Sequence, residues 1–497
     1  MSAYLDCFCQ PRLVEGGFQI SNGAVEVRHM EVGFACADIT PPLGSVIPGG
    51  FHPRFATGVH DPLLATAAVF SEGDVKLAIV SVDALSIKSS IVAIARSIAE
   101  ERIGIPKSHI LVAATHTHNG GPIADAFLCE ADKDYCDSVA KAIAQAIIEA
   151  HEHRRHALIA CGFGYEDTVA FNRRCVMKDG TQRTHPGKLA KDAVAIAGPI
   201  DPRLGVIAAV ADDGAFLGCI VNYACHATVM WGSEFSADYI HYVRETIRAV
   251  MGEQAHVVYL NGACGDVTQV AQLIPREPEV GEKWARRVGG KIGAEALKVI
   301  FGMDFDAYST EVLPLAASSK VLSLPTRKVP LQMLEQAKRL LESSDSWDTE
   351  RIYARELVLL DEANKREPMV NAEIMAMLIA DTAIVSFPCE YFCQFGLDVR
   401  RASPYPSTFI VSCANGMVGY VPTEEAFRTG GYEPRLARSS KLMPDAGALM
   451  REAAIELLRA LPKPALRRAT KLPNTSYWDA GSSPPSCSGL EVNHAGG

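Results

Sequence analysis

Short apolar runs alternate with a helical pattern in the first half of the chain. Residues 77–82 and 109–114 are strand-length apolar runs, and residues 89–103 between them place apolar side chains at helical spacing. This order is typical of a strand–helix–strand unit. Farther on, Asp212-Asp213-Gly214 separates two apolar runs, which predicts an antiparallel hairpin over 205–222. We therefore expect an α/β fold with a mixed β-sheet core flanked by helices.

The pattern changes near residue 330. Leu, Glu, Lys and Arg recur at helical spacing and predict a helical hairpin over about 330–366, inserted between sheet segments. Strand patterns return at 373–380 and 383–387 with a turn at Asp381-Thr382, and residues 444–461 predict an amphipathic helix. We expect an N-terminal arm over 1–28, one domain over 29–465, and a C-terminal arm or disordered tail over 466–497.

Composition and charge exclude several classes of protein. Hydrophobic residues make up 48% and charged residues 21% of the 497 residues, as in ordinary globular proteins. The net charge of −10 is spread along the chain, so we expect no nucleic-acid partner. The sequence shows neither the pattern of an export signal nor an apolar stretch of about 20 residues, which predicts a cytoplasmic protein without integral membrane association. The 14 cysteines are then expected to be reduced and mostly buried, and a homo-oligomer stays possible.

Two histidines follow the apolar run at 109–114. His116 and His118 belong to the segment HTHNGGP at 116–122. Side chains at positions i and i+2 point the same way if the chain stays extended, and the glycines let the backbone turn sharply around a ligand. Because neutral imidazole is a common zinc ligand, the pattern favours a metal site, with a pair of polar loop histidines as the alternative.

Other polar side chains also follow apolar strands. His226 ends one strand pattern, and Asp266 and Thr268 lie in a glycine-rich loop after another. The N–H groups of such a loop can approach a substrate, while Asp266 offers a base and Thr268 a hydroxyl. Glu390 and Tyr420 each come just past an apolar strand. Taken singly, these positions are equally or better explained by a structural histidine, a strand-to-helix turn, a surface carboxylate and a packing tyrosine.

The order of these segments resembles the catalytic domain of the neutral/alkaline (non-lysosomal) ceramidase family, especially its shorter bacterial members. The resemblance covers roughly residues 30–435. It is carried by the ordered motifs VGFACADITPP at 32–42, GVHDPL at 58–63, VSVD at 80–83, HTHNGGP at 116–122, FNRR at 171–174, CH at 225–226, SADY at 236–239, NGACGDV at 261–267 and GYE at 431–433. It implies the ceramidase catalytic-domain fold.

The resemblance also implies a function and a set of site residues. The function is that of a zinc-dependent amidohydrolase that cleaves the C–N bond of a linear carboxamide, an N-acyl amide, with metal-activated water. One zinc ion per chain is then held by His116, His226, Glu390 and Tyr420. The implied catalytic residues are His118 as proton carrier, Arg173 as substrate-positioning group and Tyr432 as hydrogen-bond donor to the oxyanion. Asp266 is expected to assist proton transfer, and Thr268 to orient substrate or water.

The sequence also departs from the family pattern. Where the family carries a serine in an Asp-x-Ser-Pro-Asn loop, this chain has Asp266-Val267-Thr268-Gln269. The export signal and C-terminal β-domain of secreted members have no counterpart, so we expect a small-molecule amide rather than a membrane lipid. Two alternatives stay open: an esterase or lactonase at the same zinc site, and a zinc-containing member without catalysis. A phosphate-handling enzyme is disfavoured, because no P-loop or GxGxxG motif follows a strand.

Overall fold

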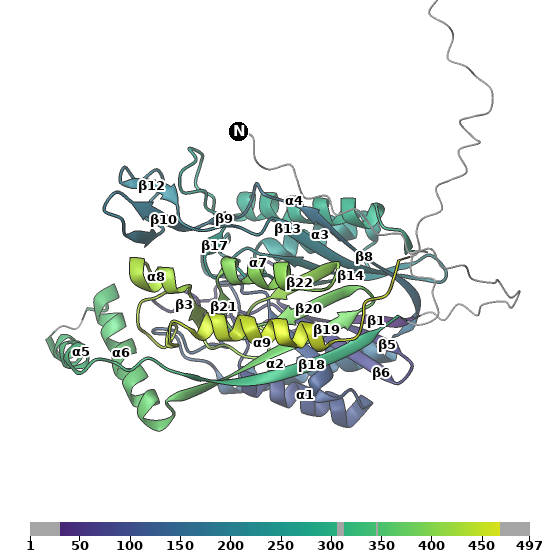
Figure 1. Ribbon diagram of the computed structural model, residues 1–497, viewed down its shortest axis with the longest axis horizontal. Helices are drawn as coiled ribbons and strands as arrows, with labels where there is room; N and C mark the ends of the chain where they lie inside the picture. The colour runs from purple at the N-terminus through teal and green to yellow at the C-terminus, as the bar shows by residue number, and fades with distance from the viewer. Residues whose placement is uncertain (1–29, 306–312, 344–345, 468–497) are drawn as a thin grey trace, which may run out of the picture.

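Two β-sheets form the centre of the molecule (Figure 1). The computed structural model describes residues 30–305, 313–343 and 346–467. The predicted N-terminal arm and the C-terminal arm from residue 468 onward lie outside the described residues. The larger sheet has the strand order β16-β14-β13-β8-β1-β5-β6-β7, and the smaller one has the order β18-β19-β20-β22.

The larger sheet is mixed, as predicted. Its strands are β1 (Met30–Asp38), β5 (Leu64–Glu72), β6 (Val75–Val82), β7 (Ile110–Ala114), β8 (Arg155–Tyr165), β13 (Arg203–Ala211), β14 (Phe216–Tyr223) and β16 (His256–Asn261). Strands β6 and β7 are parallel and are joined by α1 (Ser89–Ile103), which confirms the strand–helix–strand unit. Strands β13 and β14 form the predicted antiparallel hairpin, and β14 pairs in parallel with β16.

The larger sheet curls until its two edges meet. Strands β7 and β16 stand at opposite ends of the strand order, yet β16 packs against β5, β6 and β7. The bend falls where β1 and β8 share only a short register, from Met30 to Val32. Gly218 permits a close approach at this place, because a Cβ there would lie 2.6 Å from the carbonyl oxygen of His256 and 3.1 Å from the Phe34 ring. Asn261 then joins the edges by donating from Nδ2 to the carbonyl oxygen of Thr115 (3.1 Å).

The smaller sheet closes the open side of this curl. It consists of β18 (Leu315–Pro325), β19 (Met369–Ile379), β20 (Thr382–Ser386) and β22 (Ser407–Val411). Because strand side chains alternate between faces, one set from both sheets points inward. This inner core contains Phe34, Phe70, Ile79, Leu260, Met377 and Phe409. The core thus lies between the curled sheet and the smaller sheet.

Three groups of helices cover the outer faces of the sheets. Helices α1 and α2 (Lys133–Glu152) pack on the β1, β5 and β6 part, and α3 (Tyr239–Met251) and α4 (Glu282–Phe301) on the β13 and β14 part. Helices α7 (Cys393–Ala402) and α9 (Ala446–Ala460) cover the smaller sheet. In Figure 1, α3 and α4 lie above the sheets, α1 and α2 below, and α9 in front.

The inserted helical hairpin is present between β18 and β19, as predicted. It consists of α5 (Leu331–Ser343) and α6 (Thr349–Arg366), which pack against each other at the left end of Figure 1. Asp348 caps α6 by accepting a hydrogen bond from the backbone N–H of Arg351 (2.9 Å). The hairpin lies at the end of the molecule to which β18 leads.

Several short elements complete the described chain. They are β2 (Val46–Ile47), β3 (Arg54–Phe55), β4 (Gly58–Val59), η1 (Lys107–His109), β9 (Phe171–Asn172), β10 (Arg174–Met177), β11 (Gln182–Thr184), β12 (Ala193–Ile196), β15 (Glu234–Phe235), β17 (Val267–Thr268), β21 (Glu390–Tyr391), β23 (Tyr420–Val421) and α8 (Glu424–Thr429). Strands β10 to β12 form a small separate sheet of their own.

Element ends differ from the prediction where tertiary pairing decides them. Strand β19 begins at Met369 rather than 373, because it pairs with β18 along its whole length. The turn that follows is at Ala380 (φ 54°) and Asp381, so the predicted turn at Asp381-Thr382 is wrong by one residue. The start of the predicted C-terminal arm is docked, since Arg467 pairs with Asp381 (2.7 Å).

The described residues also bear on the expected environment of the chain. Within them, no helix combines the length and the apolar character that crossing a membrane requires. The described cysteines are buried, with Cys36 half-buried, in line with the prediction that they act as small core residues.

Candidate metal centre and active site

His116 lies two residues beyond the end of β7. Its backbone has φ 67°, so the chain is not extended there, and the condition under which His116 and His118 would point the same way is not met. The ring is buried, and its Nδ1 lies 2.6 Å from the carbonyl oxygen of Leu85. Because a carbonyl oxygen only accepts hydrogen bonds, Nδ1 carries a proton, and Nε2 is the ring nitrogen that faces the other site residues.

His226 reaches the same point from the other edge of the sheet. It follows β14, and its backbone N–H donates to the carbonyl oxygen of Val267 (3.1 Å). Its Nδ1 donates to the carbonyl oxygen of Cys264 (2.7 Å), so Nε2 is again the nitrogen that faces the other site residues. Burial and the neighbouring Arg173 lower the pKa of His226 to about 4. The two Nε2 atoms of His116 and His226 are 3.1 Å apart.

Glu390 brings a carboxylate to the same point. It lies on β21, which pairs in parallel with β23, so that Glu390 is opposite Tyr420. Its Oε2 atom is 3.3 Å from His116 Nε2 and 3.2 Å from His226 Nε2. Burial opposes the charge, but the two histidines hold the pKa of this carboxyl well below its usual range. The site therefore combines two imidazole nitrogens with a carboxylate that is held in its charged form.

The spacing of these three atoms fits a zinc ion. Ligand atoms about 2.0–2.1 Å from a tetrahedral zinc lie about 3.3 Å from one another. The observed separations are 3.1, 3.2 and 3.3 Å. The Nδ1 contacts with backbone carbonyl oxygens are the outer-shell hydrogen bonds that orient metal-binding histidines.

His118 widens the choice of ligands. With His116 and His226 it forms a group whose ligand atoms all lie within 4.8 Å of one another. Its Nδ1 lies 2.9 Å from the carbonyl oxygen of Gly49, and its buried Nε2 has no hydrogen-bond partner among the described residues. Burial and the other two histidines place the pKa of His118 well below its usual value. The geometry thus supports two candidate sets, three histidines or two histidines with Glu390.

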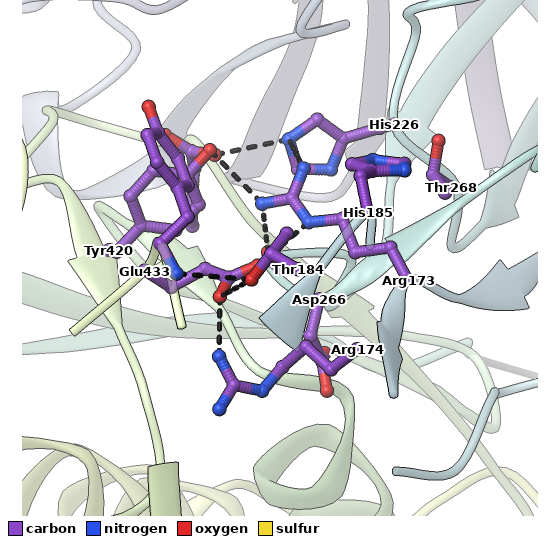
Figure 2. Close-up of polar contacts among 12 residues, drawn as sticks. Arg173, Arg174, Thr184, His185, His226, Asp266, Thr268, Tyr420 and Glu433 are labelled. Atoms are coloured by element: carbon purple, nitrogen blue, oxygen red, sulfur yellow. Dashed lines mark hydrogen bonds and ion pairs between the residues drawn. The ribbon is translucent and has the colours of Figure 1, made fainter. Parts of the chain in front are cut away.

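Arg173 connects the metal ligands to a second carboxylate (Figure 2). Its Nη2 atom donates to the Tyr420 hydroxyl (3.2 Å) and to the carbonyl oxygen of Gly265 (2.7 Å), and its Nε donates to Glu433 (2.9 Å). Its Nη1 is 3.4 Å from His226 Nε2. All these contacts are with the protein itself, so in the described geometry Arg173 positions Tyr420 and Glu433. Its predicted contact with substrate stays a prediction.

Glu433 is a site residue to which the sequence analysis gave no role. It is fully buried and accepts hydrogen bonds from Arg173, from Arg174 Nη1 (2.5 Å) and from Thr184 Oγ1 (2.6 Å). Burial opposes ionisation of Glu433, but the two arginines hold its pKa below the usual value. A signal was present in the sequence: the paired arginines of FNRR need a buried carboxylate, and GYE supplies one beside Tyr432.

Asp266 and Thr268 lie in the wall behind His226. The Asp266 carboxylate accepts from the backbone N–H of Cys393 (2.8 Å) and from Asn172 Nδ2 (2.7 Å). The Thr268 hydroxyl donates to Gln269 (2.7 Å), and Figure 2 shows it on the side of His226 away from Tyr420. Burial raises the pKa of Asp266 to about 6. The structure therefore brings neither side chain to the point where the three histidines meet.

A pocket of about 820 Å³ opens onto the candidate metal ligands. His116, His118, Glu390, Tyr420 and Tyr432 line it. The Tyr432 ring packs edge-on against Tyr420, with 5.5 Å between the ring centroids. Helix α6 of the inserted hairpin forms another part of the wall, through Leu360, Ala363, Asn364 and Arg366. The hairpin thus shapes the space in which a substrate would lie.

The fold is shared with solved ceramidase structures. One is the neutral ceramidase from Pseudomonas aeruginosa, with a TM-score of 0.66 and 17% identity over 89% of this chain and 76% of that one. Another is a ceramidase complexed with C2, with a TM-score of 0.66 and 16% identity over 89% of this chain and 77% of that one. No protein-family model and no curated protein sequence matches the chain. The expected ceramidase fold is therefore confirmed.

Proposed function

We propose that the protein is a zinc-dependent amidohydrolase that cleaves a linear N-acyl amide with activated water. The observation that carries the proposal is the meeting of His116 Nε2, His226 Nε2 and Glu390 Oε2 at 3.1–3.3 Å, where His116 and Glu390 line a pocket. The fold supports the reaction class, because the solved structures that share it are ceramidases, enzymes named for cleaving an amide.

We assign the metal to His116, His226, Glu390 and Tyr420. The first three ligand atoms have the mutual spacing that tetrahedral zinc requires, and the pairing of Tyr420 opposite Glu390 on the neighbouring strand supports Tyr420 as the fourth ligand. This leaves His118 outside the ligand set. A bound zinc ion lowers the pKa of water to near neutrality and polarises a carbonyl oxygen.

His118 is suited to move a proton beside the metal. Its Nδ1–H is held by the carbonyl oxygen of Gly49, so only Nε2 can accept a proton. That nitrogen is buried and has no partner among the described side chains. A neutral imidazole fixed in this way can take a proton from the attacking water and deliver it to the leaving amine.

Tyr432 is suited to stabilise the negative charge that develops on the amide oxygen. Burial and the nearby Tyr353 raise the pKa of its phenol well above the usual value, so the hydroxyl keeps its proton and can donate. Its ring is held by Tyr420 on one side and by Phe51 on another (6.3 Å between centroids). A donor fixed before the reaction loses little free energy in reorganisation.

Metal analysis and hydrolysis assays test this proposal together. The zinc-loaded protein is expected to hold about one zinc per chain and to hydrolyse N-acyl amides faster than the matched esters, relative to the uncatalysed rates. His116→Ala is expected to lose both zinc and turnover. His153→Ala, which changes an exposed histidine, is the matched control and is expected to keep both. Amide hydrolysis that survives in zinc-free His116→Ala would refute the mechanism.

A further inference from the structure

The pocket wall carries cations as well as the metal ligands. Lys88, Arg366, Arg438 and Lys441 line the same pocket as His116 and Glu390. Two acidic residues outside the metal site, Asp125 and Glu367, also line it. Charged groups in an otherwise apolar pocket fix the orientation and the chemical class of a ligand.

Two of these cations are neutralised by the protein. The Lys88 ammonium lies 2.5 Å from the Asp125 carboxylate. Arg438 makes a bidentate pair with Glu356 of α6, with contacts of 2.8 and 2.7 Å. In such a bidentate pair, two N–H donors of the guanidinium bind the carboxylate oxygens, and the two charges neutralise each other. Neither cation is therefore available to a ligand without breaking an existing pair.

Lys441 is different. Among the residues that the structure describes, no carboxylate oxygen lies within 4.0 Å of its ammonium group. Its side chain is half-buried, and burial together with Arg438 lowers its pKa. A partly desolvated ammonium with a cationic neighbour gains free energy from an anion. Arg366, the other pocket cation without an ion pair in the described chain, is exposed beside Glu367.

The backbone fixes Lys441 close to the metal ligands. The N–H of Arg327 donates to the carbonyl oxygen of Lys441 (2.6 Å). Two residues earlier, the carbonyl oxygen of Ser439 accepts from the N–H of Tyr420 (2.8 Å). The segment that carries Lys441 thus runs alongside the proposed ligand Tyr420, and Lys441 lines the same pocket as His116 and Glu390.

We propose that the substrate is an amide that carries one carboxylate, and that Lys441 binds this carboxylate while the amide lies at the metal. The inference rests on the proposed amidohydrolase function and names its substrate class. Lys441 is the half-buried pocket cation without an ion pair among the described residues, and one such cation matches a single negative charge.

Matched substrates test this inference. An N-acyl glycine and an N-acyl aminoethanol with the same acyl chain differ by a carboxylate in the amine portion. A half-amide of a dicarboxylic acid and the corresponding amide of a hydroxy acid place the same difference in the acyl portion. We expect the zinc-loaded protein to have a higher kcat/KM for the charged member of at least one pair, and the pair identifies which portion carries the carboxylate.

Lys441→Met is expected to lower kcat/KM for that charged substrate about 10- to 100-fold, because it removes a charge-assisted contact. The neutral partner is expected to change by less than about twofold. Lys441→Arg, which keeps the charge, should retain the preference, and Lys328→Met, at an exposed lysine outside the pocket, should behave like the wild type. Zinc content and thermal stability establish that each variant is folded and loaded.

The outcomes separate this inference from the proposed function. Equal losses on charged and neutral substrates, or no loss in Lys441→Met, would overturn the carboxylate site while leaving amide hydrolysis intact. A wild type that holds zinc but cleaves no amide would refute the proposed function. In that case, calorimetric titration measures whether the uncleaved N-acyl glycine and half-amide bind to the wild type and to Lys441→Met. Absence of binding to the wild type, or equal binding to both proteins, would refute the carboxylate site.

Discussion

Replacing Glu433 by glutamine is expected to lower the free energy of unfolding by about 3 to 5 kcal/mol, because the change removes the counter-charge of two buried arginines. Glu433 is fully buried, and its two oxygens accept from Arg173 (2.9 Å), Arg174 (2.5 Å) and Thr184 (2.6 Å). Glutamine has nearly the same shape. The change therefore tests charge and hydrogen bonding rather than packing.

The magnitude follows from what is left unpaired. Glutamine keeps one acceptor oxygen but turns an amide N–H₂ toward a donor that previously met a carboxylate oxygen. The remaining oxygen still serves one arginine, so the other loses a hydrogen bond to a charged group, which costs about 1.5 to 3 kcal/mol. Both arginines also lose their counter-charge, and breaking a buried ion pair costs about 3 to 5 kcal/mol in total. Arg174 retains its contact with Gln182 (2.9 Å).

Urea unfolding at pH 7 measures this loss, with Glu350→Gln as the matched control. Glu350 also pairs with an arginine, Arg435 (2.7 Å), but it is exposed, so its loss is expected to cost about 0 to 1 kcal/mol. The pKa of Glu433 is lowered in the folded protein, so its stabilising contribution is present above about pH 4.5 and is lost as the pH falls below that value. Below that pH, the difference in the free energy of unfolding between the wild type and Glu433→Gln should become smaller. A loss below 1 kcal/mol at pH 7, or a gap that widens in acid, would refute the reasoning.

Three further predictions concern the site. His226→Ala is expected to lose zinc, whereas His118→Ala is expected to keep zinc and lose turnover; zinc loss from His118→Ala, measured by elemental analysis, would favour the three-histidine ligand set. Tyr432→Phe is expected to keep zinc and to lower kcat about 100-fold, on the order of 3 kcal/mol, and loss of zinc would contradict the assignment. Burial raises the pKa of Asp266 from 3.8 to about 6, so its stabilising contribution is present below about pH 4 and is lost as the pH rises through 6. Between about pH 4 and pH 6, the free energy of unfolding of the wild type, measured in urea, should fall by on the order of 2 to 3 kcal/mol relative to that of Asp266→Asn. A difference between the two proteins that does not change with pH would contradict this.

Much of the fold could be predicted because it depends on local patterns. Helix α1 begins and ends at the predicted residues, and the β13–β14 hairpin and the inserted helices were predicted from turn residues and from periodicity. The curl of the larger sheet could not be predicted. It depends on the short pairing of β1 with β8 and on the contact of Gly218 with Phe34, and neither leaves a periodic signal.

The site was predicted unevenly for a related reason. His116, His226 and Glu390 were placed by the order of strand-end motifs, and the structure brings them together. Asp266 and Thr268 follow strands in the same way, but their side chains turn into the wall, because Cys393 and Gln269 provide partners there. Strand ends show which residues reach one end of a sheet, whereas side-chain direction depends on partners distant in sequence.

The meeting of the two sheet edges has a consequence for how the site comes into being. His116 follows β7 and His226 follows β14, strands on opposite arms of the curled sheet, and the arms touch only once the whole sheet has formed. A chain with either arm unfolded has no place where both imidazoles reach one ion. A metal bound by both histidines would link the two arms of the sheet, so its binding free energy would add to the stability of the folded chain as a whole.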